Sequence, residues 1–327
     1  MRAAFYEKAG PAKDVLAIRE FDKPEPGPGE VLVKVHASGV NPTDVKSRTI
    51  IFERVKHLVP IIPHQDGAGV IEAVGAGVDA SRVGERVWLY TAQWLRSFGT
   101  CAEFIALPSK LALHLPDTTS FEEGACLGVP AMTAYHAVTI NGLIEGKSVL
   151  VTGGAGAVGH YAIQIAKLLG ASQVISTISS DEKARHAKDA GADVTINYRE
   201  EDVPARVMEA TDGKGVDHYI EVDLHGNAKM LPHVCAFGGY IVVYGSNQAE
   251  ATLIAPEFYF RHLKMEGFAL YFLGEERFAE VGKAINNMLE NNQLKHRVVA
   301  NYKLDDIAKA HDDVEFGHAI GNVVMLP

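Results

Sequence analysis

The sequence predicts an α/β protein in two parts, a β-rich domain and a doubly wound parallel sheet. The first observation behind this is a glycine-rich segment at residues 149–159, between a strand pattern and a helix pattern. The second is a repeated alternation of strand and helix patterns after residue 121, which indicates a parallel sheet. The third is a series of short, glycine-bounded strand patterns before that point, typical of a compact barrel-like domain.

The glycine-rich segment carries a dinucleotide-binding signature. An apolar run at 149–151 predicts a buried strand, and the helical pattern that follows ends at Gly170. In this context the spacing of Gly154, Gly156 and Gly159 predicts a Rossmann unit. We expect Gly154 to permit the tight turn, Gly156 to let a pyrophosphate approach the helix N-terminus, and Gly159 to let helix and strand pack closely. The alternative is a glycine-rich turn that binds nothing.

Length, charge and cysteine content limit the class of protein. The 327 residues suffice for roughly two domains, and 47% are apolar. A net charge of −10 leaves no broad basic face for nucleic acid or an anionic membrane. No apolar run approaches the ~20 residues of a membrane span, and no signal peptide is expected. Cys101, Cys126 and Cys235 are too scattered for a disulfide framework or a zinc motif. We therefore expect a cytoplasmic protein without nucleic-acid or membrane partners.

The first part of the chain alternates apolar and polar residues, as half-buried strands do. The expected strands are 30–38, 67–75, 84–90 and 102–107. Residues 43–58 have a more helical pattern, and their basic residues are expected on a solvated face. These basic residues are Lys46, Arg48, Arg54 and Lys56.

The second part alternates strands and helices. The expected strands are 173–179, 193–198, 217–222, 240–244 and 264–270, the last of them buried. The expected helices are 181–190, 278–291 and 304–313. A final strand at 322–326 is expected to return to the first domain. The predicted domains are therefore 1–122 completed by 271–327, and 123–270.

The choice of dinucleotide depends on the end of the second strand. An NAD site usually has Asp or Glu about 20 residues after the glycines, but that position is Ser179. Asp181 and Glu182 follow, where the first turn of a helix capped by Ser180 favours acids. A neutral strand end beside Lys183 suits a 2′-phosphate, so NADPH is expected. The alternative is that Lys183 is one more solvated lysine.

Several segments in the same order along the chain carry a family resemblance. They are residues 39–44 (Gly-Val-Asn-Pro-Thr-Asp), 66–75, 84–87, 133–135, 152–159, 197–200 and 238–246. With them the chain resembles, essentially end to end, the zeta-crystallin-type NADPH:quinone oxidoreductases, a zinc-free branch of the medium-chain dehydrogenase/reductase superfamily. The resemblance implies a GroES-like catalytic domain with a Rossmann NADPH-binding domain inserted in it. It also implies a homodimer formed through edge strands, with 240–245 and 264–270 as the candidate region.

The resemblance also bears on zinc. Where zinc alcohol dehydrogenases have Cys, His and Cys, this chain has Asn41, Gln65 and Val129, which are not a plausible zinc set. The neighbouring His64 is expected to be a hydrogen-bonding residue. Without a Lewis acid, the acceptor has to take a hydride readily. The implied activity is zinc-independent, NADPH-dependent reduction of quinones.

Two alternatives remain open. One is the same chemistry on α,β-unsaturated ketones, aldehydes or acyl thioesters. Lys46 bears on it, since the family commonly has tyrosine there and the loop is expected to border the substrate pocket. The other is an NADPH-binding structural or RNA-associated protein with little activity, although the acidic charge speaks against RNA.

Site residues follow from the resemblance. The expected cofactor-binding residues are Asn41, Thr133, Gly154, Ala155, Gly156, Ala157, Val158, Ser179, Lys183, Tyr198, His225, Tyr244, Gly245, Ser246, Phe268, Ala269 and Leu270. The expected catalytic residues are Asn41, Asp44 and Gln65, although Asp44 and Gln65 could equally hold the loop together. Lys46, Tyr90 and Trp94 are expected at the substrate pocket, with barrel core as the alternative for the two aromatic residues. Gly317 stands where some relatives have an arginine that helps bind the 2′-phosphate.

Overall fold

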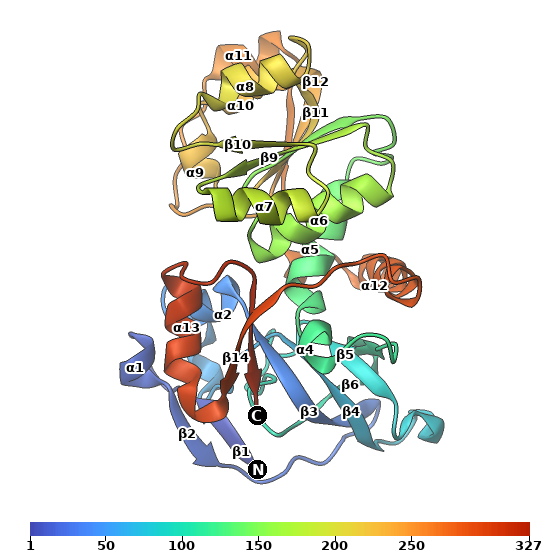
Figure 1. Ribbon diagram of the computed structural model, residues 1–327. Helices are drawn as coiled ribbons and strands as arrows, with labels where there is room; N and C mark the ends of the chain where they lie inside the picture. The colour runs from blue at the N-terminus through green and yellow to red at the C-terminus, as the bar shows by residue number, and fades with distance from the viewer. The chain divides into compact units, whose positions relative to one another are not determined.

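The computed structural model describes all 327 residues (Figure 1). The chain divides into two compact units, Met1–Pro130 with Gly282–Pro327, and Ala131–Val281. The limits predicted from the sequence, 1–122 with 271–327 and 123–270, stay a proposal for the functional domains. No helix is both long enough and apolar enough to cross a membrane.

The first unit is built on a seven-stranded sheet in which β15 returns to the N-terminal strands, as expected. The order is β14-β15-β3-β4-β5-β7, with β6 also paired to β3, and β1 and β2 form a separate two-stranded sheet. Its strands are β1 Arg2–Phe5, β2 Ala17–Glu20, β3 Glu30–Val40, β4 Asp66–Val74, β5 Arg86–Leu89, β6 Phe104–Pro108, β7 Ala112–His114, β14 Val298–Lys303 and β15 Asn322–Leu326. Its α-helices are α1 Ala12–Val15, α2 Pro42–Arg48, α3 Phe52–Val55, α4 Phe121–Gly124 and α13 Ile307–Glu315.

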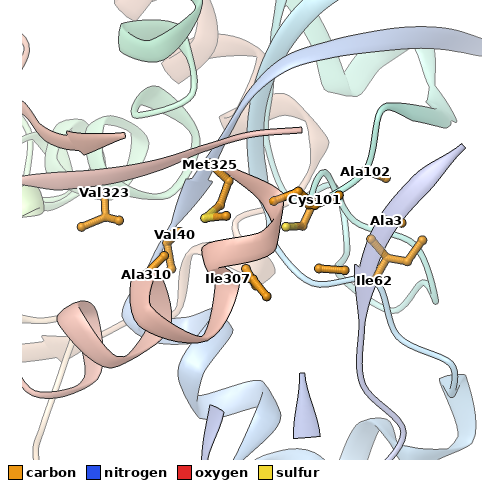
Figure 2. Packing of buried hydrophobic residues seen from close by; sticks show 11 residues of the cluster. Ala3, Val40, Ile62, Cys101, Ala102, Ile307, Ala310, Val323 and Met325 are labelled. Carbon is orange, nitrogen blue, oxygen red and sulfur yellow. The ribbon is translucent and has the colours of Figure 1, made fainter. Parts of the chain in front are cut away.

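Two packing features explain this arrangement. In β3 the valines Val33 and Val35 are buried, whereas Lys34 and His36, which alternate with them, are exposed, as the pattern predicted. At the other end of the chain α13 contacts β15 and β3. Figure 2 shows Ile307 and Ala310 of α13 in the same apolar cluster as residues of β3 and β15.

The second unit is a six-stranded parallel sheet. Its order is β10-β9-β8-β11-β12-β13. The chain therefore starts in the middle of the sheet at β8 and adds β9 and β10 on one side. It then crosses back and adds β11, β12 and β13 on the other side of β8. Its strands are β8 Ser148–Val151, β9 Gln173–Ile178, β10 Val194–Asn197, β11 Val216–Glu221, β12 Cys235–Val243 and β13 Lys264–Gly267. Its α-helices are α5 Met132–Thr139, α6 Ala157–Leu168, α7 Asp181–Asp189, α8 Val203–Ala210, α9 Leu224–Asn227, α10 Leu231–Val234 and α11 Ala255–Phe260; α12, Glu275–Glu290, runs across the limit between the units. This is the Rossmann order, with a topological switch point between β8 and β11.

The structure corrects two expectations. The segment 43–58 is not one solvated helix but α2, α3 and a short 3₁₀ turn, Lys56–Leu58. Arg48 within it is fully buried, because its guanidinium pairs with Glu315 of α13 at 2.5 Å and donates to the carbonyl of Gly10. The buried strand expected at 264–270 ends at Gly267, and all four residues of β13, which lies at the edge of the sheet, are exposed.

Candidate functional site

The turn after β8 needs glycine at two successive positions for different reasons. Gly153 has φ of 65°, in the left-handed region that glycine favours. A Cβ on Gly154 would lie 1.9 Å from Ser176 Oγ and 2.7 Å from Ile163 Cδ1. The tight turn expected of Gly154 is therefore made by Gly153, and Gly154 is required by its close contact with β9.

The two later glycines shape the start of α6. A Cβ on Gly159 would lie 2.4 Å from the carbonyl oxygen of Gly153, so this residue lets the helix pack closely on the turn, as expected. Gly156 is the N-cap of α6, and no side chain caps the helix there. The nearest atom to a Cβ on Gly156 is the Gly153 oxygen at 3.2 Å. The backbone N–H groups of Ala157 and Val158 therefore begin a helix whose N-terminus can accept an anion.

Ser179 and Lys183 come together at the carboxyl end of β9. Ser180 caps α7 by accepting a hydrogen bond from the Lys183 backbone N–H at 3.3 Å, as the sequence predicted. The Lys183 Nζ donates to Ser179 Oγ at 3.0 Å. On the next strand, β10, Tyr198 follows at the same sheet edge and is half exposed. A hydroxyl, an ammonium and an aromatic ring thus lie where a Rossmann fold holds the adenosine half of a dinucleotide.

The loops after β11 and β12 are joined to each other. The Leu224 N–H donates to the carbonyl oxygen of Gly245 at 3.1 Å, and the His225 N–H donates to Ser246 Oγ at 3.2 Å. A Cβ on Gly245 would lie 2.4 Å from the Val222 carbonyl oxygen, so only glycine fits there. The predicted residues His225, Gly245 and Ser246 are therefore one assembly at the carboxyl ends of these strands.

Two further groups of predicted residues lie in this unit. Tyr244 follows β12, and its pKa is raised by burial and by the charge of Glu221. Phe268 follows β13, and its N–H donates to the Val243 carbonyl oxygen at 3.0 Å. Beyond it Ala269 is exposed and Leu270 is buried. Thr133 is buried in α5 of this unit, and Asn41, the other predicted ribose contact, belongs to the first unit.

Sequence reasoning missed Glu221, the last residue of β11. Its side chain is fully buried and accepts hydrogen bonds from Tyr219 Oη at 2.7 Å and Thr152 Oγ1 at 3.1 Å. It also accepts from Asn227 Nδ2 at 3.0 Å and from the Asp223 N–H at 2.5 Å. Burial and the nearby carboxylate hold the pKa of Tyr219 well above its usual value. The signal that could have found Glu221 is an acidic residue at the carboxyl end of an otherwise apolar strand.

In the first unit, Asn41 connects two buried carboxyl groups. The Asn41 backbone N–H donates to Asp44 Oδ2 at 2.7 Å, and Asn41 Nδ2 donates to Asp66 Oδ2 at 2.7 Å. The Val129 N–H also donates to Asp66, at 2.8 Å. Sequence reasoning named Asp44 but missed Asp66, whose burial depends on residues far apart in the chain.

Both of these carboxyl groups are shifted toward the protonated form. Burial raises the pKa of Asp66 to about 7, against the opposite effect of its hydrogen bonds from Val129 and Asn41. Burial, and then the charge of Asp66, hold the pKa of Asp44 well above its usual value. Two carboxyl groups so placed do not both ionise near neutral pH.

Gln65 and its neighbours form closed polar contacts. Gln65 Nε2 donates to Gln93 Oε1 at 3.0 Å, and the Gln93 N–H donates to Gln65 Oε1 at 3.2 Å. No group of three or more His, Cys, Asp or Glu side chains is placed to hold a metal ion. At the three positions compared with zinc ligands, Asn41, Gln65 and Val129, the side chains are two amides and an aliphatic group, which do not fit Zn²⁺.

His64 is a hydrogen-bonding residue, as predicted. Its Nδ1 lies 2.8 Å from Ser38 Oγ and its Nε2 lies 3.0 Å from His311 Nε2. Burial lowers the pKa of His64 to about 3, and burial with the neighbouring His64 and Arg48 holds the pKa of His311 well below its usual value. Both imidazoles are therefore neutral in the folded protein.

The three predicted substrate-pocket residues differ in environment. Lys46 lies in α2 and is half-buried. Tyr90 is 5% exposed, packs against the fully buried Trp88 and donates from Oη to the Lys110 carbonyl oxygen at 3.0 Å. Trp94 is half-buried. The contacts of Tyr90 are those of the barrel-core alternative, while a pocket role for these residues stays a prediction.

Known proteins resemble the chain over its whole length. Residues 27–117 match the model of the alcohol dehydrogenase GroES-like domain, and residues 157–287 match the zinc-binding dehydrogenase model. Human quinone oxidoreductase is 32% identical over 330 residues, covering 100% of this chain and 98% of that protein. The 2-methylene-furan-3-one reductase of Solanum lycopersicum is 31% identical, covering 100% of this chain and 79% of that protein. The structure of Escherichia coli quinone oxidoreductase complexed with NADPH superposes with a TM-score of 0.87 at 26% identity, covering 100% of both chains. The chain therefore belongs to the quinone oxidoreductase family of the medium-chain dehydrogenase/reductase superfamily.

Proposed function

We propose that this protein reduces quinones with NADPH and without zinc. The observation that carries the NADPH part is the hydrogen bond between Lys183 and Ser179 at the end of β9, where an NAD site would have an acid. The quinone part is supported by the family, which includes the human quinone oxidoreductase. The Escherichia coli relative of the same fold is complexed with NADPH, which supports the choice of cofactor.

The residues of the second unit fit NADPH. The glycine turn and the uncapped start of α6 would take the pyrophosphate, with the N–H groups of Ala157 and Val158. Ser179, Lys183 and Tyr198 would surround the 2′-phosphate and adenosine, since they share one sheet edge. The loops after β11, β12 and β13 would hold the nicotinamide half. When bound, this cofactor supplies a hydride from C4 of the nicotinamide.

The side chains of the first unit limit which molecules can accept the hydride. Asn41 and Gln65 present amides, and Val129 presents no donor atom, so none of them polarises a carbonyl as a zinc ion does. A quinone needs less help, because the added electrons delocalise onto its oxygens. The amide of Asn41 is fixed by Asp66, so we propose that it orients the acceptor. Asp44 and Gln65 would support this loop, and solvent would deliver the remaining proton.

One relative and one residue support a second class of hydride acceptor, the conjugated enones and acyl thioesters. The tomato relative is named as a reductase of 2-methylene-furan-3-one, a conjugated enone. Lys46 lies in α2, close in sequence to Asn41, and would suit an anionic tail such as that of an acyl thioester. Turnover of 9,10-phenanthrenequinone, a simple enone and an enoyl thioester with NADPH separates the classes. We expect the largest kcat/KM with the quinone, and a preference for the thioester that Lys46→Ala abolishes would contradict this.

We also propose a cytoplasmic homodimer that binds neither nucleic acid nor membranes. The acidic net charge supports the absence of such partners. The exposed edge strand β13 supports the dimer, because such edges are usually paired or protected. Large apolar side chains are also exposed in and around this strand, at Met265, Phe260 and Phe237. Exposed apolar side chains of this size at a sheet edge support an interaction site there.

A further inference from the structure

Glu221 is a fully buried carboxylate without a cationic partner among its hydrogen bonds. Its four donors are the hydroxyls of Tyr219 and Thr152, the amide of Asn227 and the backbone N–H of Asp223. All four are neutral. An ionised carboxylate accepts bonds but donates none, and this set of donors satisfies it. The bonds hold the charge in place without neutralising it.

Glu221 also lies beside the topological switch point of the sheet. It ends β11, and Thr152 directly follows β8, so their hydrogen bond bridges the two strands that flank the topological switch point. Nucleotides bind outside the carboxyl ends of the strands at such a point. Asp223 and Asn227 also fix the loop that carries His225, which is tied in turn to Ser246.

The two halves of the sheet identify which end of the dinucleotide this charge faces. The strands β8, β9 and β10 carry the glycine turn, Ser179 and Lys183, which suit the pyrophosphate and the 2′-phosphate. The strands β11, β12 and β13 form the other mononucleotide half and are left for the nicotinamide. Glu221 therefore lies beneath the half of the site in which the ring is oxidised and reduced.

We infer that Glu221 is a positioning residue whose buried charge makes the site favour the oxidised, positively charged nicotinamide over the reduced, neutral ring. The inference rests on the proposed NADPH-dependent function. Its physical basis is that opposite charges attract more strongly across a low-dielectric interior than in water. A merely structural Glu221 would hold the loop after β11 equally well for both redox forms, so their affinity ratio separates the two roles.

The test is the ratio of dissociation constants for NADP⁺ and NADPH, measured by calorimetry or fluorescence. Glu221→Gln keeps the shape and an oxygen for the donors but removes the charge. Asp217→Asn is the matched control, because Asp217 is an exposed carboxylate on the same strand, four residues or roughly 13 Å towards its amino end. We expect Glu221→Gln to raise the dissociation constant for NADP⁺ about fivefold relative to that for NADPH, because the attraction to the charged ring is lost. We expect Asp217→Asn to leave this ratio of dissociation constants unchanged.

A second variant covers the case in which Glu221→Gln does not fold. Asn227→Lys keeps Glu221 and places an ammonium beside it, so we expect the ratio to rise in the same direction. If the folded variants bind NADP⁺ and NADPH with equally weakened affinity, or if the ratio of the two dissociation constants does not change, the inference is overturned. Wild-type protein that binds neither NADP⁺ nor NADPH would instead refute the proposed function.

Discussion

Lys183 Nζ donates a hydrogen bond to Ser179 Oγ over 3.0 Å, joining the first turn of α7 to the residue that follows β9. The lysine is thereby held over the strand end where the ribose of a dinucleotide is recognised. Because Asp181 and Glu182 of the same turn are exposed, the fixed group nearest the strand end is cationic. Selectivity for a 2′-phosphate is the expected consequence.

Removal of this cation should selectively weaken the binding of NADPH. We expect Lys183→Ala to raise the dissociation constant for NADPH roughly tenfold, since a hydrogen bond to a charged group is lost, and to leave NADH binding nearly unchanged. Lys188→Ala is the matched control, because Lys188 is an exposed lysine of the same helix. Equal losses for both cofactors would mean that Lys183 does not recognise the phosphate.

Two neighbouring glycines should respond differently to alanine. Gly154→Ala places a Cβ 1.9 Å from Ser176 Oγ. We therefore expect this substitution to lower the free energy of unfolding by roughly 1–3 kcal/mol. Gly156→Ala meets only an oxygen at 3.2 Å, so its stability should change by less than about 1 kcal/mol. Its NADPH affinity should nevertheless fall at least about tenfold, because the methyl group intrudes on the pyrophosphate. Chemical denaturation and calorimetry measure the two effects, and a Gly156→Ala protein with normal affinity would contradict the placement of the pyrophosphate.

Much of the fold could be predicted because its signals are local. Alternation along β3, the glycine spacing before α6 and the Ser180 cap of α7 are each set within a few residues. The return of the final strand, β15, to the first unit was also expected from the order of the elements, and the structure confirms that return. What the sequence left open was the site, since the roles of its residues stay predictions.

The features that were missed depend on partners far along the chain. Arg48 looks like a solvated residue until α13 brings Glu315 beside it. The burial of Asp66 requires Val129, and that of Glu221 requires Thr152 from another strand. No local pattern encodes such contacts, because they exist only after the strands have assembled.

Acid should destabilise the protein through its buried histidines. The folded pKa of His64 is about 3, below the ordinary value near 6.5, so the unfolded chain binds more protons between these values. Stability from this group is therefore complete above pH 6.5 and falls as the pH decreases, by about 1.4 kcal/mol per unit. His311 acts in the same direction. Asp66 acts oppositely, because its raised pKa of about 7 makes its protonated folded form more favourable from pH 7 down to about 4.

A difference between variants isolates the histidine contribution from that of Asp66. His311→Gln can keep a donor near His64 Nε2 but does not titrate. We expect the slope of its unfolding free energy against pH, from urea titrations at pH 5, 5.5 and 6, to be lower than the wild-type slope by about 1.4 kcal/mol per unit. Parallel pH profiles would show that His311 is not buried in its neutral form.

The dimer prediction concerns β13. Met265→Asp places a charge on this exposed edge, so we expect sedimentation to show a monomer with unchanged NADPH affinity. Val299→Asp is the control, since Val299 is 38% exposed, close to the 39% of Met265, but lies in β14 of the other unit. A wild-type monomer, or a dimer that tolerates Met265→Asp, would contradict the assignment of the interface.

The most direct test of the proposed activity is oxidation of NADPH and NADH, followed at 340 nm with 1,4-benzoquinone, before and after treatment with a strong chelator. We expect quinone turnover that is much faster with NADPH and is unaffected by chelation. Activity with NADH alone would contradict the role of Ser179 and Lys183. Activity lost on chelation and restored by zinc would contradict the zinc-free reaction argued from Asn41, Gln65 and Val129.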